Sequence, residues 1–261
     1  MKAKKSLGQN FLIDYNIIDK ICDCINAKEN DLIVEIGPGM GALTKKLREK
    51  KCMLICYEID EDMHKYLDKY VDSYTKIIFK DILLSDVLED IKDIKYNRLY
   101  VVGNLPYYIT TPIIKRLITL NLNASEMIFM VQDEVADRFT AHCKSKEYGS
   151  ITLYLKYYFD VEKLFKVSKK CFNPVPKVES AIIKFTKRKD KLDVLEESYF
   201  KLINDAFRMK RKNIKNNLIN YDLDIVKSVL NKYGYDLSSR AEELPEEVFI
   251  ELCNELSKKN H

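Results

Sequence analysis

The chain has 261 residues and a net charge of +4, from 44 lysines and arginines against 40 aspartates and glutamates, and 46% of it is hydrophobic. That hydrophobic content is enough for a core and excludes a wholly disordered chain. No apolar run approaches the roughly 18–20 residues of a membrane span, and the lysine-rich N-terminus lacks the apolar stretch of a secretory signal. We therefore expect a soluble, cytoplasmic protein without a membrane partner.

The cysteines and histidines form no recognisable metal-binding pattern. The chain holds seven cysteines and three histidines, and Cys22 and Cys24 are separated by a single residue. Zinc sites favour cysteine pairs separated by two or more residues, often with histidines nearby. We expect reduced, mostly buried thiols and no bound metal.

Short apolar runs alternate with helical segments in the first half of the chain. The predicted strands are residues 32–36, 53–57, 77–79, 99–102 and 127–131. The predicted helices are residues 42–50, a helix from residue 60 or 61, and one with Thr111 as N-cap and Pro112 at the first helical position. Nearly continuous apolar strands separated by helices are typical of an α/β fold with a mostly parallel sheet that is covered on both faces.

The second half is expected to complete this sheet and then to become helical. The predicted elements are an aromatic-rich helix at 148–159, strands at 162–167 and 180–185 that can form an antiparallel edge, and a polar linker at 186–191. From about residue 192 the pattern is helical. We therefore predict an α/β domain over residues 1–187 and a small helical domain over residues 188–261.

Residues at the ends of three predicted strands indicate a nucleoside pocket. The first strand runs into a glycine turn that contains Gly37 and Gly39, and glycines let ligand atoms approach the main chain closely. Glu58 ends the second strand, where a carboxylate can accept both hydroxyls of a ribose, and Asp81 follows the third strand. The carboxyl ends of parallel strands meet at one edge of a sheet, which is the usual ligand site of this architecture.

The glycine turn alone leaves an oxidoreductase open as an alternative. A dinucleotide-binding turn has its third glycine one position after Gly41, where this chain has Ala42, which some versions tolerate. The fourth strand favours another chemistry, because it runs into Asn104-Leu105-Pro106-Tyr107. The Asn104 side-chain oxygen and a nearby backbone carbonyl can accept hydrogen bonds from one exocyclic amine. Pro106 fixes the turn, and the following ring can stack on the base that carries the amine.

Several motifs resemble, in order and spacing, those of a known family. Asn104-Leu105-Pro106-Tyr107 resembles the catalytic motif of adenine-N6 methyltransferases that use S-adenosylmethionine. The whole set is similar to that of the KsgA-type small-subunit ribosomal RNA adenine dimethyltransferases: residues 6–12, 35–41, 58–60, 81–83, 172–178 and 211–218. The resemblance implies a Rossmann-like class I methyltransferase sheet flanked by helices, followed by a small all-helical C-terminal domain.

The resemblance also implies roles for individual residues. The implied cofactor-binding residues are Asn10, Leu12, Gly37, Gly39, Glu58, Asp81 and Asn104. The implied catalytic residues are Asn104, Leu105, Pro106, Tyr107 and Phe172. Tyr107 and Phe172 would sandwich a flipped target adenine, with Phe11 closing nearby as an RNA contact. No strong general base is required, because the charged product amine loses its proton readily.

The implied reaction uses S-adenosylmethionine to dimethylate the N6 amines of two adjacent adenines. These adenines lie in a hairpin loop near the 3′ end of small-subunit rRNA, in a precursor ribosomal particle. We expect a monomer. Two alternatives remain open: a large-subunit rRNA adenine methyltransferase of the macrolide-resistance type, and a non-catalytic factor that binds immature small subunits.

Two further features concern the RNA side. A segment without acidic residues carries five cations: Arg208, Lys210, Arg211, Lys212 and Lys215. Such a run is usually a solvated face, but a polyanionic substrate favours contact with phosphates. The family often has Pro-Gly where this chain has Cys143-Lys144, which leaves the shape of that loop open.

Overall fold

The computed structural model describes residue 4 and residues 7–258, so Ser6 of the N-terminal motif lies outside the described residues. The chain forms two compact units. The sheet unit comprises the chain up to residue 136 together with residues 162–187, and the helical unit comprises residues 137–161 and 188 onward. The chain passes from the sheet unit to the helical unit after residue 187, which is the predicted domain boundary. Residues 137–161, which the sequence analysis assigned to the first domain, group instead with the C-terminal helices.

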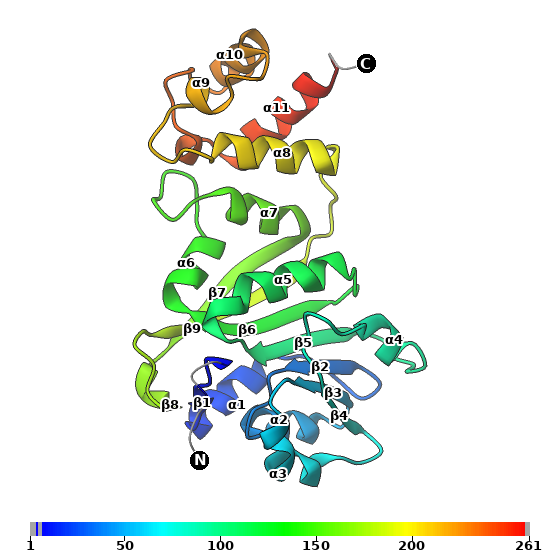
Figure 1. Cartoon of the computed structure of the whole chain (residues 1–261). Helices are drawn as coiled ribbons and strands as arrows, with labels where there is room; N and C mark the ends of the chain where they lie inside the picture. The colour runs from blue at the N-terminus through cyan, green and yellow to red at the C-terminus, as the bar shows by residue number, and fades with distance from the viewer. Residues whose placement is uncertain (1–3, 5–6, 259–261) are drawn as a thin grey trace. The chain divides into compact units, whose positions relative to one another are not determined.

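The sheet unit is built on a seven-stranded sheet with the order β4-β3-β2-β5-β6-β9-β7 (Figure 1). Five strands pair in parallel: β2 (Leu32–Ile36), β3 (Met53–Glu58), β4 (Thr75–Phe79), β5 (Leu99–Asn104) and β6 (Glu126–Gln132). Strand β9 (Ser180–Lys187) pairs antiparallel with β6, and β7 (Phe159–Val167) is its other neighbour. This arrangement confirms the predicted mostly parallel α/β sheet.

Helices cover both faces of this sheet (Figure 1). On one face lie α1 (Tyr15–Asp23), α2 (Ala42–Leu47) and α3 (His64–Leu67), and on the other lie α4 (Val87–Ile91) and α5 (Thr110–Thr119). Helix α5 begins one residue before the predicted cap, because a 3₁₀ turn, η5 (Tyr107–Ile109), leads directly into it. Pro112 is therefore its third residue, still in the first turn, where no intrahelical N–H donor is required.

Strand β2 lies at the point where the strand order reverses. All five of its residues are buried, and it pairs with β3 on one side and with β5 on the other. Its last residue, Ile36, is in register with Tyr57 and with Gly103. Connections leave this point in opposite directions, so a crevice opens at the carboxyl ends of β2 and β5.

A second, two-stranded sheet ties the N-terminal segment to a distant loop. Strand β1 (Phe11–Leu12) pairs antiparallel with β8 (Phe172–Asn173), with Leu12 opposite Phe172. Both of these side chains are buried in one hydrophobic cluster with residues of α1 and of the central strands. The sequence analysis did not predict this pairing, which joins segments 160 residues apart in the chain.

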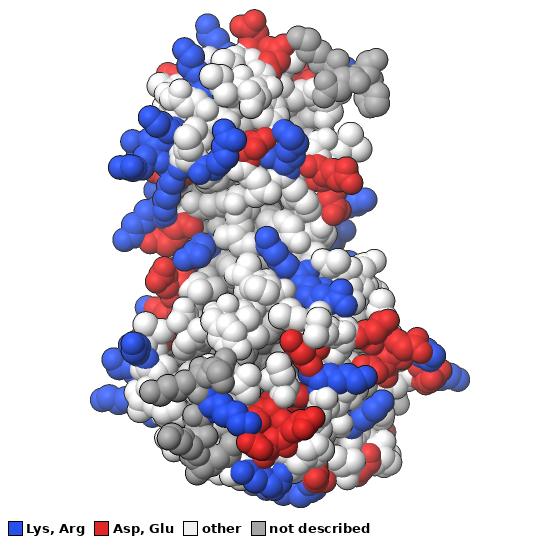
Figure 2. Space-filling view, in the orientation of Figure 1, with Lys and Arg blue, Asp and Glu red and all other residues white. Residues whose placement is uncertain are grey.

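The helical unit contains α7 (Ser150–Tyr158), α8 (Glu196–Ala206), α9 (Ile214–Asn217), α10 (Leu223–Lys232) and α11 (Glu246–Lys258), and the chain enters it through α6 (Asp133–Phe139). Aromatic packing explains why α7 belongs here, because the ring of Tyr157 lies 5.0 Å from that of Phe200 and 5.8 Å from that of Tyr199. Figure 2 shows lysine and arginine side chains gathered where the loops after α6 and α8 lie in Figure 1.

Remaining short 3₁₀ turns link these elements: η2 (Arg48–Lys50), η3 (Glu61–Met63), η4 (Asp68–Tyr70), η6 (Lys169–Cys171) and η7 (Ala241–Glu243). In the described part of the chain, no three His, Cys, Asp or Glu side chains are grouped so that they could hold a metal ion. All seven cysteines are free thiols. Across residues 7–258, no helix has the length and apolarity needed to cross a membrane.

Candidate active site

A cavity opens in the sheet unit at the carboxyl ends of the central strands. Its walls come from residues 7–12, from the glycine turn after β2, and from the ends of β3, β4 and β5. The predicted site residues that it brings together are Asn10, Phe11, Leu12, Gly37, Gly39, Glu58, Asp81, Asn104, Leu105, Pro106 and Tyr107. The cavity therefore occupies the crevice that the strand order creates.

The glycine turn is shaped by a close approach of the N-terminal segment. Gly39 has a φ of +58°, a left-handed conformation that favours glycine. A Cβ atom at this position would lie 3.1 Å from two ring carbons of Phe11, so the absence of a side chain lets Phe11 pack on the turn. The Gly39 N–H also donates a hydrogen bond to Glu58 Oε2 at 2.9 Å. These contacts fix the turn against both β3 and the N-terminal segment.

Glu58 is held in place by the backbone at the end of β3. Its side chain is buried, and Oε1 accepts a hydrogen bond from the Asp60 N–H at 2.9 Å while Oε2 accepts the one from Gly39. Burial raises the pKa of Glu58, and the hydrogen bonds from these backbone groups oppose that rise. Each carboxylate oxygen has a further lone pair. The carboxylate can therefore accept ribose hydroxyls without losing its backbone partners.

Asp81 follows β4 and lines the same cavity. Its Oδ1 atom accepts a hydrogen bond from the Leu83 N–H at 2.9 Å, which orients the carboxylate. An amino group of a bound base can therefore donate to the same carboxylate, which has acceptor capacity to spare.

Asp60 fastens the N-terminal segment beside the cavity. It is 2% exposed, and its carboxylate accepts hydrogen bonds from Lys4 Nζ at 2.5 Å and from Gln9 Nε2 at 2.6 Å. Burial raises the pKa of Asp60, but these two hydrogen bonds hold it below its ordinary value. Sequence reasoning missed this role, because the partners are 56 and 51 positions away and no local pattern connects them.

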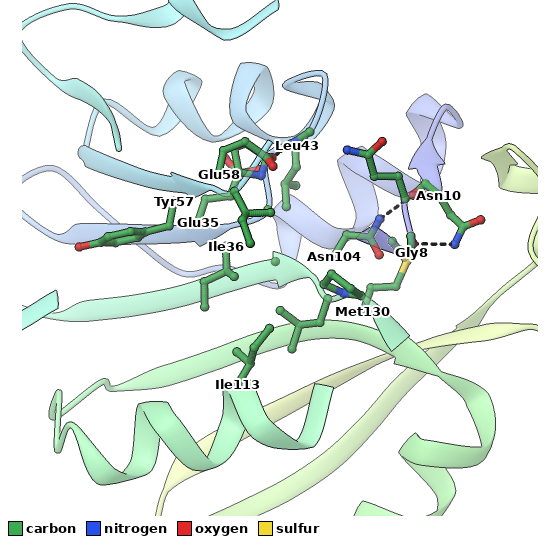
Figure 3. Close-up of a pocket in the computed structure, with 18 of the residues that line it drawn as sticks. Gly8, Asn10, Glu35, Ile36, Leu43, Tyr57, Glu58, Asn104, Ile113 and Met130 are labelled. Carbon is green, nitrogen blue, oxygen red and sulfur yellow. Dashed lines mark hydrogen bonds between the residues drawn. The ribbon is translucent and has the colours of Figure 1, made fainter. Parts of the chain in front are cut away.

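Asn104 ends β5 and is anchored to the N-terminal segment (Figure 3). Its Nδ2 group donates a hydrogen bond to the Asn10 backbone carbonyl at 3.0 Å, and Asn10 Nδ2 donates to the Gly8 carbonyl at 3.1 Å. One N–H of the Asn104 amide is thus used within the protein. Its side-chain oxygen is the group that remains to accept a hydrogen from a substrate amine.

The residues after Asn104 place an aromatic ring on the cavity wall. Leu105 is buried, and its N–H donates to the Met130 carbonyl of β6 at 3.1 Å. Pro106 leads into η5, where Tyr107 lies with its hydroxyl 2.7 Å from Ser180 Oγ. Burial raises the pKa of Tyr107, so the phenol stays neutral at physiological pH. The site thus combines an amide acceptor with a fixed ring, a few residues apart.

Phe172 takes a different position from the one expected. Its ring is 1% exposed and packs in the hydrophobic cluster around β1 and α1, and it is not part of the cavity wall. The reason is the β1–β8 pairing, which places Phe172 opposite the buried Leu12. In this structure Phe172 packs against the N-terminal segment, and the aromatic residues that line the cavity are Phe11, Tyr57, Tyr107 and Tyr108.

Glu35 lies beneath the glycine turn and was not singled out from the sequence. It is 1% exposed and lines the cavity (Figure 3). It also accepts a hydrogen bond from Cys56 Sγ at 3.4 Å. Burial raises the pKa of Glu35 to about 7, and the nearby Glu58 carboxylate acts in the same direction.

This raised pKa predicts a pH-dependent stability. From the unperturbed value of 4.5 up to about 7, the folded chain keeps a proton on Glu35 that the unfolded chain releases. Glu35 therefore makes its full contribution to the free energy of unfolding at low pH. This contribution falls by about 3 kcal/mol as the pH rises to 7. Glu35→Gln should not lose stability from this position as the pH rises. Denaturant unfolding at pH 5 and pH 8 measures the free energy of unfolding of both proteins, and an equal pH dependence in the two would contradict a raised pKa for Glu35.

The five cations predicted to contact RNA lie in the helical unit. All five are exposed in the loop after α8 and at the start of α9: Arg208, Lys210, Arg211, Lys212 and Lys215. The buried Asn217 shapes this loop, because its side chain accepts from the Met209 N–H at 3.0 Å and donates to the Met209 and Lys212 carbonyls. Lys210 Nζ also donates to the Lys146 carbonyl at 2.6 Å. The loop that contains Lys146 therefore borders the basic segment.

The Cys143-Lys144 departure keeps a glycine-like backbone. Lys144 has a φ of +71°, in the left-handed region that favours glycine. Its N–H donates to the Glu242 carbonyl at 2.7 Å, and the Ser145 N–H donates to the His142 carbonyl at 3.2 Å. The turn is thus formed with lysine at the position where the family that this chain resembles often has glycine.

The chain is similar to several known proteins. The chain matches the family model described as Ribosomal RNA adenine dimethylase over residues 1–258. It is 38% identical to the Ribosomal RNA small subunit methyltransferase A of Staphylococcus carnosus, over 98% of this chain and 90% of that protein. The protein of the same name from Bacillus pumilus is 40% identical, over 98% and 91%.

Two solved structures are also similar. A dimethyladenosine transferase from Plasmodium falciparum has a TM-score of 0.78 and 25% identity, over 96% of this chain and 98% of that one. The 23S rRNA methyltransferase ErmE has a TM-score of 0.73 and 24% identity, over 95% and 100%. The sheet and its strand-end cavity define a Rossmann-like class I methyltransferase. The chain belongs to the ribosomal RNA adenine dimethylase family, which confirms the resemblance found in its motifs.

Proposed function

We propose that this enzyme transfers methyl groups from S-adenosylmethionine to the N6 atoms of two adjacent adenines. The adenines lie in a 3′-terminal hairpin loop of small-subunit rRNA, and the products are N6,N6-dimethyladenosines formed during ribosome biogenesis. The observation that carries the proposal is the placement of Asn104 and Tyr107 in one cavity with Gly37, Glu58 and Asp81. An acceptor for an amine and a stacking ring thus lie beside a nucleoside-binding edge.

The residues of the cavity fit S-adenosylmethionine. The buried Glu58 carboxylate suits the ribose hydroxyls, Asp81 suits the adenine amine, and the glycine turn leaves room for the methionine part. Asn10 and Leu12 close the cavity from the N-terminal side. When bound, S-adenosylmethionine supplies an electrophilic methyl group whose sulfur leaves as a neutral thioether.

The protein activates and positions the target amine. Hydrogen bonds from that amine to Asn104 Oδ1 and to the Leu105 carbonyl favour a pyramidal nitrogen and offset the positive charge that develops on it. Pro106 holds these acceptors in one geometry, and stacking on Tyr107 contributes about 1–3 kcal/mol to holding the flipped base. Positioning supplies much of the rate. The surplus proton of the product amine passes to water.

The partner is small-subunit rRNA in a precursor particle, bound by a cytoplasmic monomer. We propose that the catalytic domain lies within residues 1–187, where residues 137–161 of the helical unit interrupt it, and that residues 188–261 contact the ribosome. Phe11 and the cations Arg208, Lys210, Arg211, Lys212 and Lys215 would contact RNA. Lysine and arginine contacts to phosphates make such binding salt-dependent.

The substrate is tested with methyl-labelled S-adenosylmethionine and both ribosomal subunits from cells that lack this methylation. Label on small-subunit RNA alone supports the proposal. Label on large-subunit RNA alone would favour the macrolide-resistance type of activity instead. Binding to small subunits without any label would leave only an assembly role. Nicotinamide cofactors serve as a control, because a rise in melting temperature with them would restore the oxidoreductase alternative.

Glu58→Gln should weaken cofactor binding. Glutamine has one acceptor oxygen, so an NH₂ group must face the N–H of either Gly39 or Asp60. Hydrogen bonds to a charged group contribute about 1.5–3 kcal/mol, which corresponds to a loss of affinity of roughly 10- to 100-fold. Calorimetry with S-adenosylmethionine measures the change, with the exposed Glu89→Gln as the control. Equal affinities in both variants would remove Glu58 from the site.

A further inference from the structure

The hydroxyl of Tyr107 is tied to a serine on another strand. Tyr107 Oη and Ser180 Oγ are 2.7 Å apart, and the serine side chain is 0% exposed. Tyr107 is half-buried, and Ser180 provides a hydrogen-bond partner for its hydroxyl across 73 positions of sequence. The contact holds the far end of the ring, while the turn after Pro106 holds the near end.

The strand that carries Ser180 is rigidly connected to the catalytic strand. Ser180 begins β9 opposite Gln132 at the end of β6, and Met130 of β6 lies opposite Asn104 of β5. The Asp133 N–H donates to the Glu179 carbonyl at 3.0 Å, which fixes the residue before Ser180. Ser180 and Asn104 are thus both held in register by the same strand, β6.

We propose that Ser180 is a positioning residue that fixes the direction of the Tyr107 ring for stacking on the target adenine. The inference rests on the proposed function, in which Tyr107 carries the base. Without the Ser180 hydroxyl the ring can swing about its Cα–Cβ bond and leave the stacking position. Ser180 itself is not part of the cavity wall.

The contact matters more for the second methyl group than for the first. An unmethylated amine has two N–H groups, which can donate to Asn104 Oδ1 and to the Leu105 carbonyl. A monomethylated amine has one N–H and can make only one of these bonds, so stacking supplies a larger share of the positioning. Loss of the hydrogen bond that holds the Tyr107 ring should therefore allow the first transfer and slow the second, and N6-monomethyladenosine should accumulate.

The test compares Ser180→Ala, Tyr107→Phe and the double variant on unmethylated small subunits. Each single variant should slow the second transfer by about tenfold, with affinity for S-adenosylmethionine within about twofold of wild type. The double variant should be no slower than either single one, because both changes remove one hydrogen bond. Thr152→Val removes a buried hydroxyl bonded to the Arg138 carbonyl in the helical unit, and it should keep the wild-type product ratio.

Three outcomes would overturn the inference. One is a wild-type ratio of mono- to dimethyladenosine in Ser180→Ala. Another is multiplication of the two single effects in the double variant, which would indicate independent roles. The third is failure of Tyr107→Phe to accumulate the monomethyl product, a result that does not depend on how Ser180→Ala folds. In each case dimethylation by the wild type would leave the proposed function standing. A wild type that methylates no adenine would overturn both.

Discussion

Replacing Asn104 by alanine is expected to lower methyl transfer by about 100-fold or more, because the side-chain acceptor for the target amine is lost. The variant also loses the hydrogen bond to the Asn10 carbonyl, which anchors the N-terminal segment. Binding to small subunits should survive, since the basic segment lies in the other unit. Single-turnover transfer from labelled cofactor measures the rate, and a filter-binding assay measures the particle affinity.

Asn104→Asp separates the two losses in this prediction. Aspartate keeps an acceptor oxygen but cannot donate to the Asn10 carbonyl. If amine recognition dominates, Asn104→Asp should retain more activity than Asn104→Ala. An alanine variant whose rate stays within about tenfold of wild type would show that Asn104 is not the acceptor.

Replacing Gly103 by alanine is expected to destabilise the sheet at the entrance to the site. A Cβ atom there would lie 2.5 Å from the backbone oxygen of Ile36, its partner on β2, and the two strands are buried. Backbone must move to relieve this overlap, at a cost of about 3 kcal/mol. For a chain of this size the melting temperature should fall by roughly 6–12 °C.

Gly149→Ala is the matched control for this effect. Its φ of −167° is ordinary extended backbone, and an added Cβ would meet no atom within 4 Å. Its unfolding free energy should change by less than about 1 kcal/mol. Equal melting temperatures for the two variants would contradict the close packing of β2 against β5.

Much of the fold followed from local sequence patterns. The near-continuous apolar runs predicted β2, β3, β5 and β6, because strands buried on both faces exclude polar residues. Residues at strand ends were also predictable as a group. Gly37, Glu58, Asp81 and Asn104 come together because parallel strands end at one edge.

Long-range pairing accounts for what the sequence analysis missed. Phe172 lies in a short motif that matches the family, but its burial depends on the pairing with β1, which no periodicity reveals. The grouping of α7 with the C-terminal helices depends on rings that lie about 40 residues apart, such as Tyr157 and Phe200. The roles of Asp60 and Ser180 likewise rest on partners far away in the chain.

The most direct test of the central claim identifies the methylated nucleoside and its position. Small subunits that lack the modification are incubated with the protein and labelled S-adenosylmethionine, and the rRNA is then digested and analysed by mass spectrometry. We predict N6,N6-dimethyladenosine at two adjacent adenines near the 3′ end, and none with Asn104→Ala. Label on another nucleoside, or dimethyladenosine formed equally by Asn104→Ala, would contradict the account.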